Sequence, residues 1–209
     1  GGDDGLVSML VLLENEIAAH RRSFLWISAW VPATIAITAT VARAGSAKWS
    51  VVLSRQSHGP LHWTALSSPF EFVAFFVFLL SGLVGLQLPP FHSLDRGARH
   101  RAGAELGLFG LNGFYSGFLW CLVATGLFLG GQPIRDPAEV PFAAAIFQLF
   151  SSVAKAGITL VVLRVVAKAL PQLRQDQMTE FCWRILTPVG ALCLVGELVW
   201  LGIFSGGGS

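Results

Sequence analysis

Residues 183–204 read WRILTPVGALCLVGELVWLGIF, and this run contains only two charged side chains, Arg184 and Glu197. With a rise of about 1.5 Å per residue, a helix of this length covers about 30 Å, the thickness of the hydrocarbon core of a bilayer. Four other stretches are similarly long and apolar. The sequence therefore predicts five spans, at residues 23–42, 69–91, 105–130, 141–166 and 183–204.

The composition indicates the same class of protein. Hydrophobic residues make up 54% of the chain and charged residues 12%, and the mean hydropathy is +0.65. Such a chain has too little polar surface to cover a soluble globule. Because lipid offers no partners to backbone N–H and C=O groups, spans of this length are expected to be helices. We expect an all-α, polytopic membrane protein with about five transmembrane helices.

The two ends of the chain lie outside the predicted membrane domain at 23–204. Residues 1–22 contain a short apolar run at 6–13, but Glu14 and Glu16 follow where the cleavage region of a signal peptide would be small and neutral. A short amphipathic helix on the membrane surface is the expectation for this segment. Residues 205–209 are expected to form a flexible tail.

Positive side chains are distributed unequally between the two sides of the predicted spans. One side carries eight lysines and arginines and the other carries four. By the positive-inside rule, the N-terminus and the connections after the second and fourth spans face the cytoplasm or matrix, and the C-terminus faces the other side. The eight are Arg21, Arg22, Arg96, Arg99, Arg101, Lys168, Arg174 and Arg184, and the four are Arg43, Lys48, Arg55 and Arg135.

The connection between the last two spans carries the most informative motif. Residues 171–178 read PQLRQDQM, and CWR at 182–184 and LTP at 186–188 lead into the final span. This order resembles the last cytoplasmic or matrix loop of NADH dehydrogenase subunit 1, the quinone-channel membrane subunit of respiratory complex I. The family pattern there is P-R-x-R-x-D-Q-L-M, followed by a Trp-Lys pair and an L-P helix start.

Further landmarks extend the resemblance over residues 20 to 200. LFLGG at 127–131, PF at 90–91 and a lysine at Lys155 occur in the family order. The family has eight spans, and this chain resembles the last five. The resemblance implies either a C-terminal fragment of a split subunit, with a separate chain supplying the N-terminal helices, or a paralogue that lost that half.

The chain departs from the family at the carboxylates that link the quinone chamber to the membrane arm. Glutamate or aspartate positions of the family are occupied here by Trp26, Trp30, Gly85, His92 and Gly113. Tryptophan and glycine cannot exchange a proton. Two interpretations follow: the chain takes the place of the subunit without its proton chemistry, or other ionisable groups restore a path.

Three ionisable residues within the spans are candidates for such coupling groups: Glu71, Lys155 and Glu197. A charge at membrane depth costs at least about 2.5 kcal/mol, so each is expected to face protein or water and to have a partner. Lys155 is the strongest candidate, because it also matches a family lysine. The alternative for Lys155 is a structural ion pair with Glu197, and the alternative for Glu71 is an interfacial position at a helix end.

Two other sets of residues have predicted roles. Arg174, Asp176 and Gln177 keep the family pattern and are expected to dock against a hydrophilic subunit of the peripheral arm. A stripe of glycines on one face of the third span is expected to let a neighbouring helix approach closely. These glycines are Gly103, Gly107, Gly110, Gly113 and Gly117.

The resemblance implies a subunit of a proton-pumping NADH:ubiquinone oxidoreductase that is not catalytic by itself. Its partners would be other membrane and peripheral-arm subunits, membrane lipids and no nucleic acid. No cofactor is expected on this chain itself, while ubiquinone would occupy a cavity shared with other chains. A mitochondrial inner membrane is expected, with a bacterial plasma membrane as the alternative. The rival functions are the membrane subunit of an energy-converting hydrogenase and a stand-alone transporter or assembly scaffold.

Overall fold

The computed structural model describes residues 3–56, 63–86, 104–130, 142–169 and 175–205. Every regular element within these ranges is a helix, as the apolar composition predicts. The helices are α1 (Asp3–Ala44), α2 (Trp49–Arg55), α3 (Thr64–Ser67), α4 (Pro69–Gly85), α5 (Ala104–Phe128), α6 (Phe142–Ala169), α7 (Gln175–Phe181) and α8 (Thr187–Ser205).

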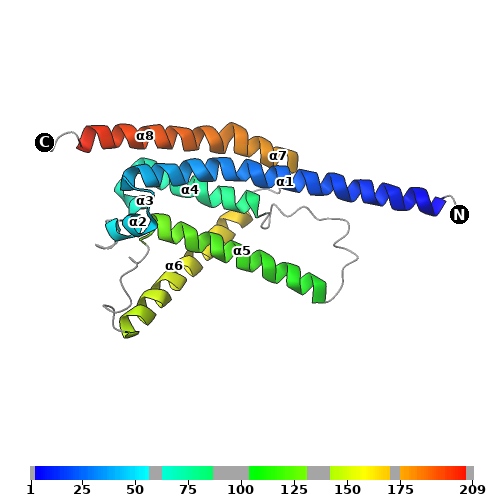
Figure 1. The fold of residues 1–209 in the computed structure, drawn as a ribbon, viewed down its shortest axis with the longest axis horizontal. Coiled ribbons are helices and arrows are strands. Elements are labelled where there is room, and N and C mark those ends of the chain that lie inside the picture. Colours follow the sequence, from blue (N-terminus) through cyan, green and yellow to red (C-terminus); the bar gives the residue numbers. More distant parts are fainter. Residues whose placement is uncertain (1–2, 57–62, 87–103, 131–141, 170–174, 206–209) are drawn as a thin grey trace.

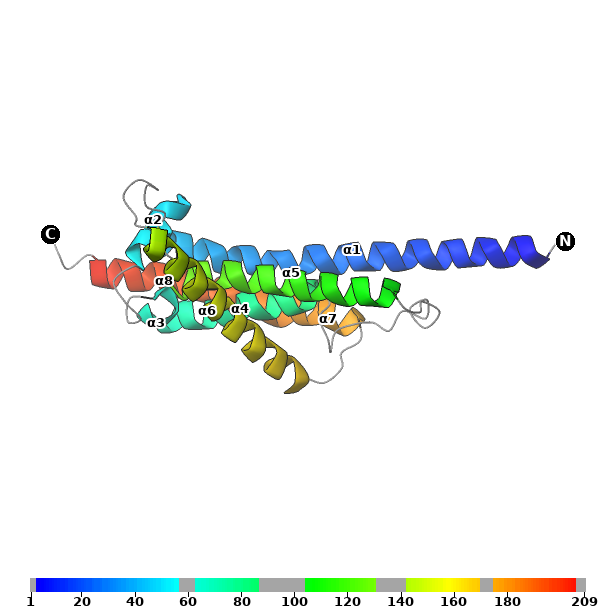
Figure 2. The ribbon, with the colours of Figure 1, turned by 90° about the horizontal axis from the view of Figure 1, so that it is seen from below.

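Helices α1, α4 and α8 pack side by side, and α5 joins this group through α4 (Figure 1). Helix α6 packs on α5 and crosses the bundle obliquely, which is clear from below (Figure 2). Helices α1, α5 and α8 end at the side that holds α2, α3 and the C-terminus, while α4 and α6 start there (Figure 1). The long helices therefore alternate in direction, as a chain that crosses a membrane repeatedly requires.

Four helical segments among the described residues are long and apolar enough to cross a membrane: Ser23–Ala44, Leu111–Phe128, Ile146–Ala169 and Gln177–Ile203. The shorter α4 is also apolar, and it lies between α1 and α8. Its described part ends at Gly85, and the end of the expected span at 91 lies outside the described residues. The prediction of an all-α, polytopic membrane protein is confirmed.

The N-terminal segment is helical, and it continues without a break into the first span as the 42-residue helix α1. At about 1.5 Å per residue this helix is about 63 Å long, which exceeds the thickness of a hydrocarbon core. Its first part extends beyond the other helices (Figure 1). The helix also contains Pro32, because helices buried in a membrane protein tolerate the loss of one backbone donor.

The last span contains a π-helical turn at Cys182–Leu186, between α7 and α8. Pro188 has no N–H to donate, so the regular hydrogen-bonding pattern is interrupted at this point. The hydroxyl of Thr187 donates to the carbonyl of Cys182 over 2.8 Å and partly compensates. The motif that leads into the last span is therefore a local widening of one continuous helix.

Close packing of the bundle depends on glycines that face aromatic rings. A Cβ atom added at Gly82 of α4 would clash with Nε1 of Trp120 on α5. The Trp120 ring stacks on Phe78, with centroids 4.5 Å apart, and its Nε1 donates to the Phe78 carbonyl over 3.1 Å. Helix α5 reaches α4 because Gly82 leaves room for this indole.

We expect Gly82→Ala to lower the thermal stability of the protein in detergent by about 1–3 kcal/mol, because the added methyl group displaces Trp120. Gly157→Ala is the matched control, since a Cβ there would meet nothing within 4 Å. The control should gain helix propensity of up to about 1 kcal/mol. Equal melting temperatures for the two variants would contradict the packing assigned to Gly82.

Candidate functional site

A cluster of polar side chains lies inside the apolar bundle, where α1, α4 and α8 meet near the α3 end. Glu197 of α8 and Glu71 of α4 are both fully buried. The guanidinium of Arg43, near the end of α1, forms an ion pair with Glu197 Oε1. The hydroxyl of Ser68 donates to Glu197 Oε2 over 2.5 Å. Both carboxylate oxygens of Glu197 are therefore paired, by donors from two other parts of the chain.

The start of α4 explains how Glu71 and Ser68 come together. Ser68 is the N-cap residue, Pro69 follows it, and Glu71 is in the first turn, so the segment has the S-x-x-E pattern of a capping box. The backbone N–H of Glu71 donates to Ser68 Oγ over 3.1 Å, which is one half of that motif. The Glu71 side chain instead contacts Thr40 of α1, with Oε2 3.2 Å from Thr40 Oγ1.

The alternative interpretation of Glu71 as an interfacial residue is wrong. Its side chain has no exposed surface, because α1 and α8 cover the start of α4. Its Oε1 atom has no hydrogen-bond partner among the residues that the structure describes. Glu71 is thus a buried carboxyl group with one unpaired oxygen, which is a costly arrangement in a protein interior.

The predicted ion pair between Lys155 and Glu197 is also wrong, because Glu197 pairs with Arg43 on a different helix. Lys155 Nζ donates to the carbonyls of Leu129 and Gly130, over 3.3 and 3.0 Å. It also lies 4.9 Å from the centroid of the Trp63 ring. The carbonyls at the end of a helix lack intrahelical partners and carry partial negative charge, so the end of α5 supplies the compensation that Lys155 needs.

Aromatic rings occupy the first span at the positions where the resemblance implies carboxylates. Trp26 and Trp30 make an edge contact with centroids 5.5 Å apart, and Trp30 makes another with Trp120 at 5.4 Å. The indole N–H of Trp183 donates to Ser28 Oγ over 3.2 Å. Of the other changed positions, Gly85 packs near Ala29 in the described structure, and His92 lies outside the described residues.

The structure describes the predicted docking loop only in part. Arg174 lies outside the described residues, as does the side chain of Asp176. Gln177 is exposed on α7, the short helix that starts at Gln175. The docking role remains a prediction.

The glycine stripe on α5 is largely unused within this chain. A Cβ added at Gly107 or Gly113 would meet nothing within 4 Å, whereas Gly117 is buried. Gly103 and the surroundings of Gly110 lie outside what the structure describes. Close approach of a helix from this chain at Gly107 and Gly113 is therefore excluded among the described residues, and approach by a partner helix remains a prediction.

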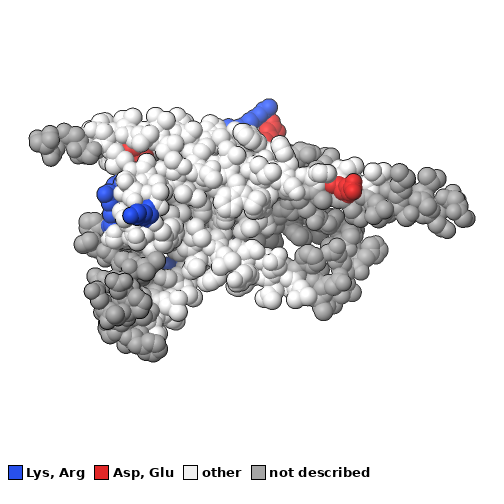
Figure 3. Space-filling model, viewed as in Figure 1, with Lys and Arg blue, Asp and Glu red and all other residues white. Residues whose placement is uncertain are grey.

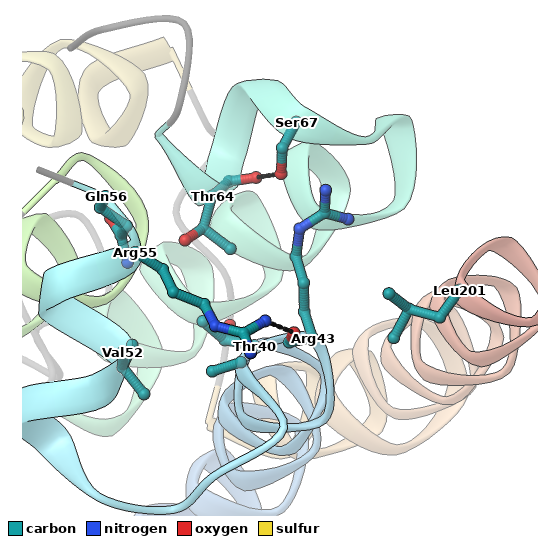
Figure 4. A pocket seen from close by; sticks show the side chains of 9 residues that line it. Thr40, Arg43, Val52, Arg55, Gln56, Thr64, Ser67 and Leu201 are labelled. Atoms are coloured by element: carbon teal, nitrogen blue, oxygen red, sulfur yellow. Dashed lines mark hydrogen bonds between the residues drawn. The ribbon is translucent and has the colours of Figure 1, made fainter. Parts of the chain in front are cut away.

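A pocket of about 330 Å³ lies beside the charge cluster (Figure 4). Its wall includes Thr40, Arg43, Arg55, Thr64 and Ser67, so it is lined largely by polar groups from α1, α2 and α3. The Arg55 guanidinium donates to the backbone carbonyl of Arg43 over 3.1 Å (Figure 4). On the outer surface, basic side chains gather near α2, while most of the face shown is uncharged (Figure 3).

Gln56 fixes the position of α2 against α5. Its Nε2 donates to the Leu127 carbonyl over 2.8 Å, and its Oε1 accepts from the Gly130 backbone N–H over 2.7 Å. Gly130 has φ +74°, a conformation that L side chains rarely adopt. The end of α5 is thus held by Gln56 from one helix and by Lys155 from another.

The comparison with known proteins agrees with this helical arrangement and with the motif of the last loop. A family model described as NADH dehydrogenase matches residues 16–197. The chain belongs to this family. It is similar to a membrane-arm homologue named as an NADH-quinone oxidoreductase subunit in Anaeromyxobacter dehalogenans, with 31% identity over 196 residues, which cover 83% of this chain and 48% of that protein.

Two other relatives give the same result. The protein of the same name from Chlorobaculum tepidum is 23% identical over 84% of this chain and 53% of its own length. The one from Helicobacter pylori strain Shi470 is 27% identical over 86% of this chain and 53% of its own length. This NADH dehydrogenase family member therefore spans about half the length of the relatives it matches.

Sequence reasoning identified the carboxyl groups of the cluster but missed three of their partners: Thr40, Arg43 and Ser68. Arg43 was counted only as a charge at the end of the first span. The S-x-x-E pattern at 68–71 could have identified Ser68 as a cap. Nothing local in the sequence indicates that Arg43 meets Glu197, since 154 residues separate them.

Lys155→Met should lower the free energy of unfolding by about 1–3 kcal/mol, because the carbonyls of Leu129 and Gly130 lose their donor. Lys168→Met is the control, since Lys168 is exposed in the last turn of the same helix. Thermal unfolding in one detergent compares the two. If both variants unfold at the wild-type temperature, Lys155 does not hold the end of α5.

Proposed function

We propose that this chain is a membrane-arm subunit of a proton-pumping NADH:quinone oxidoreductase. In this role it completes the junction between the membrane arm and the hydrophilic arm and walls part of the quinone cavity. The observation that carries the proposal is the family match over residues 16–197, together with the alternating membrane helices. The names of the relatives favour this assignment over the membrane subunit of an energy-converting hydrogenase.

The redox chemistry belongs to partner chains in this proposal. The described residues contain no group of three or more His, Cys, Asp or Glu side chains that could hold a metal ion. Cys121, Cys182 and Cys193 are all buried, free thiols. Ubiquinone would occupy a cavity shared with other subunits, and phospholipids would cover the exposed apolar faces. The relatives compared above are bacterial, which favours a bacterial plasma membrane over the mitochondrial inner membrane.

The proposal includes further membrane helices, on a separate chain, that correspond to the half of the relatives not covered here. Helix α5 offers them an uncovered apolar face beside Gly107 and Gly113. Leu108, Leu111 and Tyr115 of the same helix are 66%, 64% and 59% exposed. A glycine-containing face lets a neighbouring helix approach closely, and exposed large side chains on both sides add contact area.

Purification of the native complex through a tag on this chain, followed by mass spectrometry, tests the proposed function. We expect an NADH-oxidising flavoprotein, peripheral-arm subunits and a chain with about three further membrane helices. Recovery of a nickel-iron subunit would instead assign the chain to a hydrogenase. A stable monomer without partners would contradict membership of any such complex.

The docking role of the last loop gives a separate prediction. Arg174→Ala combined with Asp176→Ala should release the peripheral arm during purification. A charge-assisted hydrogen bond shielded from water is worth about 1.5–3 kcal/mol, so its loss should be measurable as lower retention of the arm.

Glu180→Ala combined with Arg184→Ala is the control for the docking experiment. This pair forms an exposed i,i+4 ion pair of 2.8 Å close to the loop, and it removes the same two charges. The control should retain the arm. Normal retention in the loop variant as well would show that the loop does not dock.

A further inference from the structure

The hydroxyl of Thr40 faces two acceptors inside the bundle. Its Oγ1 atom lies 3.2 Å from the backbone carbonyl of Ala36 and 3.2 Å from Glu71 Oε2. A hydroxyl group has one proton to donate, so it cannot serve both acceptors at once. Thr40 is also buried, because its exposed fraction is 1%. One further proton is therefore needed between Thr40 and Glu71.

A protonated Glu71 carboxyl supplies that proton. Its Oε2–H donates to Thr40 Oγ1, and the Thr40 hydroxyl then donates to the Ala36 carbonyl. Each of these three oxygens then takes part in a complete hydrogen bond. A carboxylate at Glu71 would instead leave either its own Oε2 or the Ala36 carbonyl without the Thr40 proton, in addition to the unpaired Oε1.

The charges around Glu71 support the same assignment. From α1 it faces Thr40 and the Arg43 guanidinium, and from α8 it faces the Glu197 carboxylate and the Cys193 thiol. Its own helix adds the Ser68 hydroxyl, which is already donated to Glu197. The cluster thus holds two carboxyl groups and one guanidinium, and Glu197 takes the direct ion pair. A second buried carboxylate would lack a direct cationic partner, which is strongly unfavourable.

Thr40 connects this carboxyl group to water. Thr40 and Arg43 both line the 330 Å³ pocket, while Glu71 does not (Figure 4). The Thr40 hydroxyl is therefore the group that stands between the carboxyl of Glu71 and the pocket. Because the pocket has polar walls and ample volume for several waters, it can receive and deliver protons.

We propose that Glu71 is a buried proton-binding site that exchanges its proton with water in this pocket through Thr40. In the release step the O–H bond at Glu71 Oε2 breaks and a new O–H bond forms at Thr40 Oγ1. At the same time the original Thr40 proton passes to a pocket water. One carboxylate and one hydronium ion result, and uptake reverses each step.

The position of the site sets the side on which exchange occurs. The pocket lies beside α2 and α3, at the same end of the bundle as the C-terminus (Figure 1). The positive-inside rule places that end opposite the cytoplasm or matrix. Glu71 would therefore exchange protons with the outer side. This inference goes beyond the proposed function and does not depend on it.

Infrared spectroscopy tests the proposal directly, because a protonated carboxyl group has a C=O stretching band that a carboxylate lacks. We expect the protein, purified with its partners, to show a band that shifts in D₂O and is lost in Glu71→Gln. Glu180→Gln is the control, since Glu180 is exposed on α7, and it should keep the band. A wild-type spectrum identical to that of Glu71→Gln would overturn the proposal.

Thr40→Val tests the route and does not require Glu71 to be replaced. This variant keeps the volume of the side chain but removes the hydroxyl, so the carboxyl band should remain and its exchange in D₂O should slow. Exchange at the wild-type rate would overturn the role of Thr40. If Glu71→Gln does not fold, persistence of the band in Thr40→Val still supports the site, and absence of the band from the wild-type protein still refutes it.

Discussion

The structure of this membrane protein depends on a single buried carboxylate, Glu197, and on the two donors that pair with it. The guanidinium of Arg43 and the hydroxyl of Ser68 reach Glu197 from α1 and from the cap of α4. A charge within a span is tolerated only where protein groups replace its hydration. Helices α1, α4 and α8 must therefore come together at this point, and they form the best-packed part of the bundle.

The same constraint explains which contacts surround the cluster. A Cβ added at Gly196, beside Glu197, would clash with the ring of Phe70, so this glycine allows α4 and α8 to approach. Glu71 is drawn into the interior because it follows Ser68 in the first turn of α4. The polar groups that bind the helices together thus also create the one buried carboxyl with an unpaired oxygen among the described residues.

The sequence predicted the class, the spans and the family, because these follow from long apolar runs and from an ordered set of motifs. It also identified Glu71, Lys155 and Glu197 as residues that need partners. The partners themselves could not be predicted. Lys155 was paired with Glu197 by charge alone, but it binds the carbonyls at the end of α5, and backbone acceptors leave no trace in a sequence. Whether a helix continues across residue 23 is likewise decided by packing and not by composition.

A double-mutant cycle on Arg43 and Glu197 tests the central claim most directly. Arg43→Met and Glu197→Met should each lower the free energy of unfolding by about 3–5 kcal/mol, because each leaves the charge of the other residue without its partner. The double variant removes both charges, so its loss should be well below the sum of the two single losses. Additive losses, or single losses no larger than that of Arg55→Met at the exposed edge of the pocket, would contradict the account.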